Sequence, residues 1–131
     1  MTDRAVVDTS VFVALETGRV IDRGSLPSEN AVTPVTLGEL HWAIQAASTP
    51  DRRSARLATL QFASRFRLLS PGFDAARHWG QLRESLRSSS QVRVNDLWIA
   101  AIAMEYRLPV CTQDRGFFAI RDAGGPDVIL V

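Results

Sequence analysis

Ala5-Val6-Val7-Asp8-Thr9-Ser10 is an apolar run that ends in an acid and two hydroxyls. Residues 5–7 have the composition of a strand that is buried on both faces, as in a parallel sheet covered by helices. Asp8 then follows the carboxyl end of this strand, which is the edge where open α/β sheets bind their ligands. Asp8 is therefore either a ligand or the cap of the following helix, a role that Thr9 or Ser10 would fill equally well.

The rest of the chain alternates apolar-periodic segments with turn signals. The pattern predicts helices at residues 10–17, 34–47, 52–66, 73–87, 94–104 and 117–120, and further strands at residues 31–33, 67–70, 108–112 and 128–131. Helical spacing predicts three buried stripes, which are Leu37, Leu40, Ile44 and Ala47; Leu57, Leu60, Phe62, Ala63 and Phe66; and Ala76, Trp79, Leu82 and Leu86. This order of elements is typical of an α/β sandwich.

Length and composition predict one globular domain over residues 1–131. The chain has 131 residues, of which 46% are hydrophobic and 22% are charged. Its longest apolar run, residues 97–104, is far shorter than a membrane span, and its first residues lack the pattern of a signal peptide. We therefore expect a cytoplasmic protein without a membrane partner, in which the single cysteine, Cys111, is a small buried hydrophobic residue.

Charge is distributed unevenly along a chain whose formal net charge is only +1. Residues 52–93 contain nine arginines and two acids, whereas the segments on either side are acidic. A metal-dependent nuclease needs clustered carboxylates that bind cations and an arginine surface that binds phosphates. The alternative is that Arg52, Arg53, Arg56 and Arg65 simply form the solvated face of a helix. The absence of lysine excludes Schiff-base chemistry and a phosphate-loop lysine.

Four acids stand where strands end or helices begin, and these are Asp8, Glu39, Asp96 and Asp114. Each has a purely structural alternative as a cap or turn residue. If the fold brings them to one edge of the sheet, they would raise one another's pKa unless a cation neutralised them. Because the set contains only oxygen ligands, the cation would be Mg²⁺ or Mn²⁺.

Two of these acids depend on where their helices begin. Thr36 and Glu39 match a capping box, in which the glutamate would only satisfy backbone amides. Thr33 followed by Pro34 is the stronger start signal, and it leaves Glu39 in the second turn. Asn95 is expected to cap the helix whose first turn contains Asp96, where the helix dipole favours an ionised carboxylate.

Four segments resemble those of the PIN-domain ribonucleases, and most closely the toxin subunits of bacterial VapBC-type toxin–antitoxin pairs. The segments are VVDTSV at residues 6–11, TLGEL at residues 36–40, NDLWIAAIA at residues 95–103 and CTQDRGF at residues 111–117. The resemblance covers essentially the whole chain and implies a three-layer sandwich, with helices on both faces of a short parallel sheet. The chain departs from the family at Gly116, where many relatives carry a further acid. Asp114 is therefore the one acid at this corner of the site.

The resemblance implies a metal-dependent endoribonuclease that cleaves structured RNA, such as tRNA or rRNA, and so inhibits translation and growth. Asp8, Asp96 and Asp114 would hold one or two Mg²⁺ or Mn²⁺ ions, with Glu39 binding through water, and the metal would activate a water for attack on a phosphodiester. Hydrogen bonds from Thr9, Ser10 and Thr112 would orient the carboxylates. The candidates for contacts with the RNA backbone are Arg52, Arg53, Arg56, Arg87, Arg93 and Arg115.

The implied partners are a cognate antitoxin, which wraps the toxin and blocks the acidic cleft, and a second copy of the chain in a homodimer. Two other functions use the same fold. One is a PIN-type nuclease of RNA maturation, and the other is a catalytically inactive module that binds RNA or a protein, which Gly116 keeps open. A receiver-like phospho-acceptor domain is disfavoured because such domains need a lysine near the acidic pocket.

Overall fold

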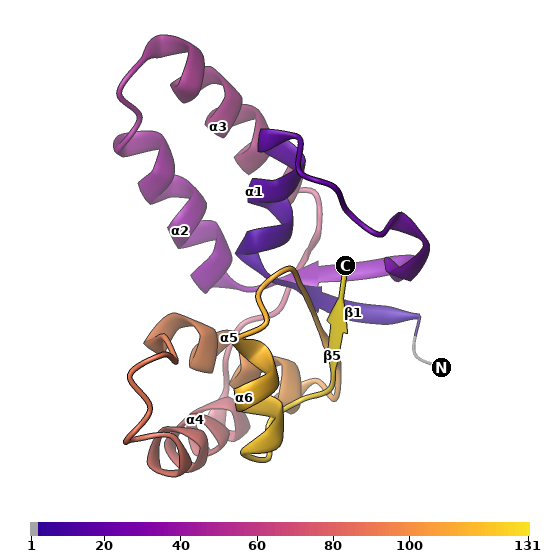
Figure 1. The fold of residues 1–131 in the computed structure, drawn as a ribbon, viewed down its shortest axis with the longest axis vertical. Helices are drawn as coiled ribbons and strands as arrows, with labels where there is room; N and C mark the ends of the chain where they lie inside the picture. The colour runs from indigo at the N-terminus through magenta and orange to yellow at the C-terminus, as the bar shows by residue number, and fades with distance from the viewer. Residues whose placement is uncertain (1–2) are drawn as a thin grey trace.

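A five-stranded parallel sheet lies between two layers of helices in the computed structural model, which describes residues 3–131 (Figure 1). The strands, in the spatial order β3-β2-β1-β4-β5, are β1 (Arg4–Val7), β2 (Glu29–Val32), β3 (Arg67–Leu68), β4 (Val110–Thr112) and β5 (Val128–Leu130). The helices are α1 (Thr9–Thr17), α2 (Pro34–Gln45), α3 (Pro50–Ala63), α4 (Phe73–Ser85), α5 (Val94–Glu105) and α6 (Phe117–Asp122), with a 3-10 turn, η1 (Arg23–Ser25), before β2. The predicted α/β sandwich is confirmed.

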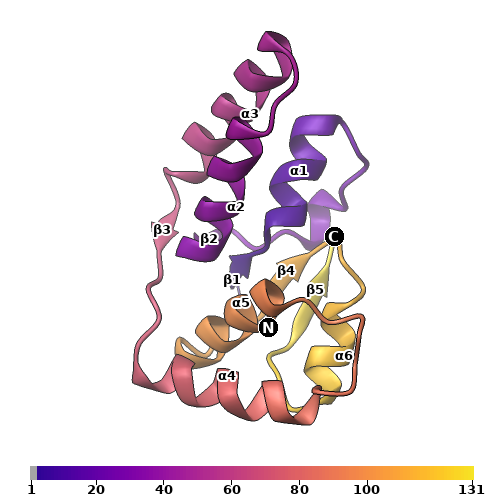
Figure 2. The same cartoon turned by 90° about the vertical axis from the view of Figure 1, so that its left-hand side faces the viewer.

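Each face of the sheet is covered by its own apolar core. Helices α1, α2 and α3 cover one face, and α4, α5 and α6 cover the other (Figures 1 and 2). Along β1, Ala5 and Val7 join the α1–α3 core, whereas Val6 joins the α4–α6 core. Alternate residues of a strand point to opposite faces, so a strand buried on both sides needs the unbroken apolar run that the sequence shows.

The central strand β1 is paired with β2 on one side and with β4 on the other. Val7 lies opposite Cys111, and the backbone amide of Asp8 donates to the carbonyl oxygen of Cys111 at 2.9 Å. The carboxyl ends of β1 and β4 are therefore level. Cys111 is fully buried, as predicted, and burial followed by the charge of Asp8 raises the pKa of its thiol to about 11.

Helix α5 is buried on nearly every side. Leu97 and residues 99–103 are at most 1% exposed, as expected for a helix that is apolar all round. The predicted cap at Asn95 is wrong, because the helix begins at Val94 and the extended N-cap residue is Arg93, without a side-chain cap bond. Packing against the sheet fixes where this helix begins, and Asp96 remains in its first turn.

The buried stripes of two other helices differ from the prediction. On α3, Leu57 and Phe62 are 45% and 44% exposed, because this helix packs on α1 and α2 through a stripe narrower than its apolar face. On α4, Ala76 is exposed and Ala75 is buried. The contact with α5 follows residues 75, 79, 82 and 86, which is the spacing of two closely packed helices.

Two helix boundaries follow the predicted signals. Gly18 ends α1 with a positive φ of 74°, a conformation that glycine adopts without strain. Thr33 caps α2 by accepting a hydrogen bond from the amide of Thr36 at 3.3 Å, with Pro34 at the first helical position. The helix therefore does not begin with a capping box at Thr36, and Glu39 lies in the second turn. None of the helices within residues 3–131 has the length and hydropathy needed to cross a membrane.

A carboxylate at the end of α5 caps the start of α4. Glu105 accepts hydrogen bonds from the amides of Gly72 at 3.1 Å and Ala75 at 3.0 Å, where the N-cap glycine itself offers no side chain. A Cβ atom at Gly72 would lie only 2.8 Å from the Glu105 carboxylate, so glycine is needed for this approach. The long-range contact joins the two helices that form most of the α4–α6 core.

Replacing this cap should destabilise the fold measurably. We expect Glu105→Ala to lower the free energy of unfolding by about 1–2 kcal/mol, because it leaves helix N-terminal amides without an acceptor. Glu105→Gln keeps a hydrogen-bond acceptor and should lose less of the free energy of unfolding. Glu84→Ala removes only an exposed ion pair with Arg87 and should change the free energy of unfolding by under ~0.5 kcal/mol. Urea unfolding of the three variants makes the comparison, and equal losses for Glu105→Ala and Glu84→Ala would contradict it.

Candidate active site

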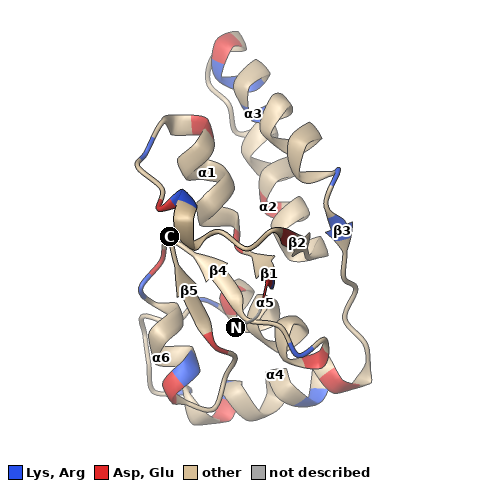
Figure 3. Ribbon diagram, turned by 90° about the vertical axis from the view of Figure 1, so that its right-hand side faces the viewer, with Lys and Arg blue, Asp and Glu red and all other residues tan. Residues whose placement is uncertain are grey.

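The four acids singled out from the sequence gather at the carboxyl edge of the sheet. Asp8 directly follows β1, and Asp114 lies two residues after β4. Asp96 is in the first turn of α5, and Glu39 is in the second turn of α2. The parallel order β2-β1-β4 brings the ends of these strands and the starts of these helices together, as Figure 3 shows at the centre of the molecule.

Asp8 is the most deeply buried of the four, with 4% of its surface exposed. Its Oδ2 atom accepts hydrogen bonds from the Ser10 hydroxyl at 2.7 Å, the Thr112 hydroxyl at 2.9 Å and the Ser10 amide at 3.3 Å. Asp8 is therefore the N-cap of α1 as well as a strand-end acid. Burial raises the pKa of this carboxyl above its usual value, against the opposing effect of these hydrogen bonds. Because the bonds converge on Oδ2, the Oδ1 atom is the oxygen left for a ligand.

The two hydroxyls beside Asp8 also bind the chain that leaves β4. Ser10 Oγ accepts from the amide of Gln113 at 3.0 Å, and Thr112 Oγ1 accepts from the amide of Asp114 at 2.9 Å. The hydroxyls lie 3.1 Å apart. The network therefore links the start of α1 to the segment that carries Asp114, and it holds both acids in a defined orientation.

Glu39 is held by the hydroxyl of Thr9, the first residue of α1. This hydroxyl donates to Glu39 Oε1 at 2.7 Å, and its oxygen lies 3.0 Å from Thr36 Oγ1. Thr36 is fully buried and one helical turn before Glu39. The sequence analysis considered Thr36 only as one half of a capping box with Glu39, and it missed the contact with Thr9 because Thr9 lies on another helix.

Asp114 is oriented by the turn that leads into α6. Its Oδ1 atom accepts a hydrogen bond from the amide of Gly116 at 2.8 Å. A Cβ atom at Gly116 would lie 3.1 Å from the same oxygen, so a larger residue would press on the Asp114 carboxylate. The backbone amide of Gly116 therefore helps to fix the orientation of the Asp114 carboxylate.

The electrostatics of Asp96 show that this acid is affected by the other three. The pKa of Asp96 is raised to about 7, first by burial and then by the charges of Asp8, Asp114 and Glu39 in that order, against a lowering by Arg93. A carboxyl with this pKa is poised between its two protonation states near neutrality. The site therefore stores repulsion that a bound cation would relieve.

The chemistry of the site is limited to oxygen ligands. Within residues 3–131, no three of the histidine, cysteine, aspartate and glutamate side chains are already arranged as ligands of one metal ion. The donors that converge are carboxylates and hydroxyls, a set that suits Mg²⁺ or Mn²⁺ and does not suit zinc. The arrangement can bind a hard cation once its carboxylates turn inward, and it can position a water for attack on an electrophile.

Three comparisons with known proteins agree with this geometry. The family model described as the PIN domain matches residues 5–123. Ribonuclease VapC5 of Mycobacterium tuberculosis (strain ATCC 25618 / H37Rv) is 47% identical over 127 residues, which cover 96% of this chain and 94% of the relative. Ribonuclease VapC4 of the same strain is 38% identical over 120 residues, covering 91% of this chain and 92% of the relative.

A solved structure is similar over its whole length. The crystal structure of VapBC-5, a member of the VapBC family of toxin–antitoxin systems from Mycobacterium tuberculosis, matches with a TM-score of 0.89 and 44% identity. The match covers 99% of this chain and 100% of that chain. The resemblance inferred from four sequence segments is therefore confirmed by the whole fold.

The raised pKa of Asp96 predicts that removing its charge stabilises the folded protein by an amount that depends on pH. The folded protein holds the proton of Asp96 up to about pH 7, whereas the unfolded chain releases it near pH 4, so this group's contribution to stability is lost as the pH rises through 7. In the metal-free protein, Asp96→Asn should therefore gain about 1–2 kcal/mol in stability relative to the parent between pH 5 and pH 8, after allowance for partial exposure.

The measurement is urea unfolding in EDTA at both pH values. Asp74→Asn, at an exposed acid in the first turn of α4, provides the matched control and should show no such change. A stability difference between Asp96→Asn and the parent that stays constant from pH 5 to pH 8 would show that Asp96 is not under the repulsion inferred here.

Proposed function

This chain belongs to the PIN-domain family, and on that premise we propose that it is a metal-dependent endoribonuclease, the toxin of a type II toxin–antitoxin pair. The observation that carries the proposal is the convergence of four carboxylates at one edge of the sheet, where the charges of three of them add to burial in raising the pKa of Asp96. A protein that needed these residues only as helix caps would gain nothing from bringing them together. Two relatives are named ribonucleases, and this chain covers more than 90% of the length of each.

We propose that Asp8, Asp96 and Asp114 hold Mg²⁺ or Mn²⁺, with Glu39 acting through a water. The donor set fits such a cation, because each of the four contributes hard oxygen atoms. A divalent ion at this position would lower the pKa of a bound water and stabilise the charge that develops on a phosphodiester. Gly116 gives the Asp114 corner one carboxylate, which favours a single tightly held ion.

The protein's own contribution is to orient these carboxylates. Ser10 and Thr112 hold Asp8 through Oδ2, which leaves its Oδ1 atom for a ligand. Thr9 holds Oε1 of Glu39, which leaves Oε2 for a ligand or a water. A carboxylate held in this way loses little freedom when it binds a ligand, and the site is partly preorganised.

The predicted arginines contribute to RNA binding unequally. Arg93 acts on the charge of Asp96, and Arg115 follows Asp114 directly, so these two are the best placed for phosphates at the scissile bond. Arg52 and Arg53 lie at the outer end of α3, away from the acids (Figure 3). Arg56 donates to the carbonyl of Ala43 and connects α3 to α2. Arg87 is 3.6 Å from Glu84, an exposed ion pair that RNA phosphate can replace.

The proposed partner is an antitoxin that docks an apolar segment between α1, α2 and α3. A cavity of about 320 Å³ lies there, lined by Val13, Leu40, Ala43 and Ala46 and flanked by Trp42. Trp42 is 72% exposed, and a large exposed aromatic beside an apolar groove is typical of a binding hot spot. The likeness to a solved toxin–antitoxin structure supports an antitoxin as the occupant of this groove. A protein that acts on RNA and binds an antitoxin would work in the cytoplasm. We propose that it does so as part of a dimeric complex.

The catalytic assignment is tested by Asp8→Asn. We expect cleavage of tRNA and rRNA, and growth arrest on induction, to fall at least 100-fold while the folded state persists, because asparagine keeps the cap but not the charge. EDTA should abolish cleavage by the parent, and Mg²⁺ or Mn²⁺ should restore it. Asp74→Asn, which changes an exposed acid on α4, should cut at the parental rate.

The readout is sequencing of RNA ends after brief induction, beside gel assays with purified RNA. Parental cleavage by a folded Asp8→Asn variant would refute the site assignment. Cleavage without growth arrest, and without a neighbouring antitoxin gene, would instead indicate RNA maturation.

Docking of the antitoxin is tested by Trp42→Ala. Because Trp42 is largely exposed, its loss should leave the free energy of unfolding within ~0.5 kcal/mol of the parent but weaken antitoxin binding about 10- to 100-fold. Phe73→Ala removes an aromatic side chain that is 97% exposed at the start of α4 and is the matched control. Calorimetric titration with the cognate antitoxin makes the measurement, and equal affinities of the two variants would place the antitoxin elsewhere.

A further inference from the structure

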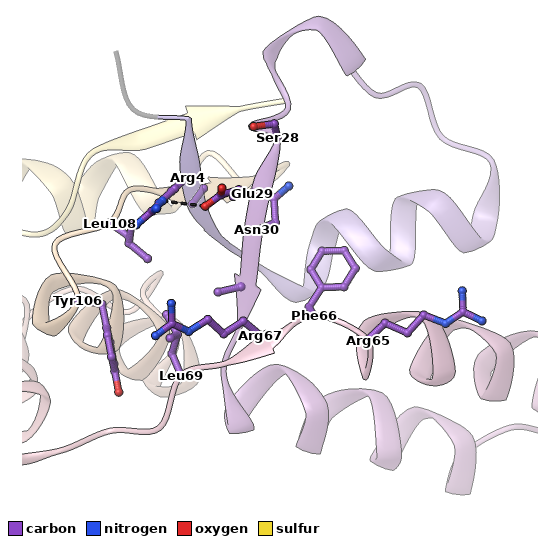
Figure 4. A pocket seen from close by; sticks show the side chains of 12 residues that line it. Arg4, Ser28, Glu29, Asn30, Arg65, Phe66, Arg67, Leu69, Tyr106 and Leu108 are labelled. Atoms are coloured by element: carbon purple, nitrogen blue, oxygen red, sulfur yellow. Dashed lines mark ion pairs between the residues drawn. The ribbon is translucent and has the colours of Figure 1, made fainter.

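A cavity of about 550 Å³ lies at the end of the sheet opposite to the acids (Figure 4). It is lined by Arg4, Asn30, Arg65, Phe66, Arg67 and Tyr106, and we call it the edge pocket. Arg4 and Glu29 begin β1 and β2, whereas Asp8 follows the last residue of β1. At ~3.3 Å per residue, the pocket is about 13 Å from the candidate active site along the strand axis. Its volume is in the range of sites for small organic ligands.

The edge pocket exists because β3 is only two residues long. Arg67 and Leu68 pair with Ala31 and Val32, so within the described residues no strand runs beside the first half of β2 on the side away from β1. Asn30 lies opposite Ala5, which belongs to the α1–α3 core, whereas Ala31 belongs to the α4–α6 core. The cavity therefore reaches both faces of the sheet around this open edge, with Phe66 and Arg65 on one side and Arg67 and Tyr106 on the other (Figure 4).

The charge of the edge pocket is positive and mostly not neutralised. Arg4 forms an ion pair with Glu29 at 2.8 Å, and both side chains are about two-thirds exposed. Arg65 and Arg67 form no ion pair with any residue of the range 3–131. Two guanidinium groups that flank a cavity without a carboxylate partner are suited to bind phosphate oxygens.

The pocket also offers two aromatic surfaces of fixed orientation. The Tyr106 hydroxyl donates to the carbonyl of Ser70 at 2.9 Å, which anchors a ring that is 38% exposed. Phe66 packs edge-to-face on Phe12, with ring centroids 5.3 Å apart. Anchored rings beside cationic groups are the usual platform for stacking nucleic-acid bases.

A buried acceptor in the pocket has no partner in the protein. The side-chain amide nitrogen of Asn30 donates to the carbonyl of Pro27 at 2.7 Å, which fixes the orientation of the amide. Its Oδ1 atom is buried and accepts no hydrogen bond within the described part of the chain. Buried acceptors are rarely left unsatisfied, so this atom marks an unmet hydrogen bond in the wall of the pocket.

We propose that the edge pocket binds one nucleotide of an RNA strand, outside the catalytic site. Arg65 and Arg67 would contact phosphates on either side of the sheet edge, and Tyr106 would stack on the base. The inference rests on the proposed ribonuclease function and adds a second contact for the same substrate.

The first test measures RNA affinity against salt concentration. Binding of a short fluorescein-labelled single-stranded RNA of mixed sequence is followed by anisotropy in EDTA, where cleavage is not required. Arg65→Gln/Arg67→Gln should bind about 10-fold more weakly than the parent and reduce the slope of log affinity against log salt by about 1.4, since each phosphate contact on a single strand contributes ~0.7. Arg77→Gln/Arg121→Gln removes two arginines that pair with Asp74 and Asp122 and should behave as the parent.

A second variant separates stacking from charge. Tyr106→Leu should weaken RNA binding about 10-fold and leave the salt slope unchanged, because stacking releases no counterions. Urea unfolding verifies that each variant is folded. Two results for a folded Arg65→Gln/Arg67→Gln variant would overturn the proposal. One is an RNA affinity and salt slope equal to those of the parent. The other is a loss of antitoxin binding while RNA binding stays intact.

Competition identifies the chemistry that the pocket recognises. Adenosine 5′-monophosphate should displace the labelled RNA from the parent more effectively than inorganic phosphate does, and this advantage should be lost in Tyr106→Leu. Equal displacement by inorganic phosphate would show a simple anion site and would overturn the assignment to a nucleotide. Because these assays measure binding alone, a protein that binds RNA through the edge pocket but fails to cut it would refute the ribonuclease proposal and not this one.

Discussion

The backbone hydrogen bonds between β1 and β4 are the constraint on which the site depends. The amide of Val6 donates to Pro109 and that of Asp8 to Cys111, each at 2.9 Å, and these bonds set the two strands level at their carboxyl ends. Thr112 then reaches the carboxylate of Asp8, and Asp114 follows within two residues. Residues more than a hundred positions apart thus become neighbours through strand pairing alone.

Bringing these acids together works against the stability of the fold. Asp8 is nearly inaccessible to water, and its pKa is raised despite three hydrogen bonds to one oxygen. Asp96 stands at the positive end of a helix, a position that favours its charge, and its pKa is still raised to about 7. Local unfavourable electrostatics in an otherwise consistent structure are characteristic of a functional site, because function and not folding selects them.

The sequence predicts the parts of this protein that depend on local chemistry. The unbroken apolar run before Asp8, the Thr33-Pro34 start of α2 and the Gly18 end of α1 each determine backbone conformation within a few residues, and each prediction agrees with the structure. The buried face of a helix is less predictable, because it depends on which other element packs against that helix. Ala75 and not Ala76 meets α5, and Leu57 is 45% exposed although it lies on the apolar face of α3.

The candidate site needed information that no local pattern contains. Each acid alone is consistent with a cap or a turn, and their convergence depends on the strand order β3-β2-β1-β4-β5. The resemblance of four segments to one family implied a parallel sheet with a shared acidic site, but the sequence analysis gave no strand order. The contact of Thr36 with Thr9 and the edge pocket were missed for the same reason, because Thr9 comes from α1 and the pocket exists where a strand is absent.

The two helices that carry Asp96 and Glu39 are anchored very differently. Helix α5 is enclosed by the sheet and by α4, and its six buried residues leave it no room to shift. Helix α2 extends away from the sheet with α3 and presents Trp42 to solvent (Figure 2). Asp96 is thus carried by an enclosed helix, whereas Glu39 is carried by a helix whose outer face is open to solvent. A protein that bound this outer face of α2 would contact the helix that carries Glu39 without touching any of the four acids.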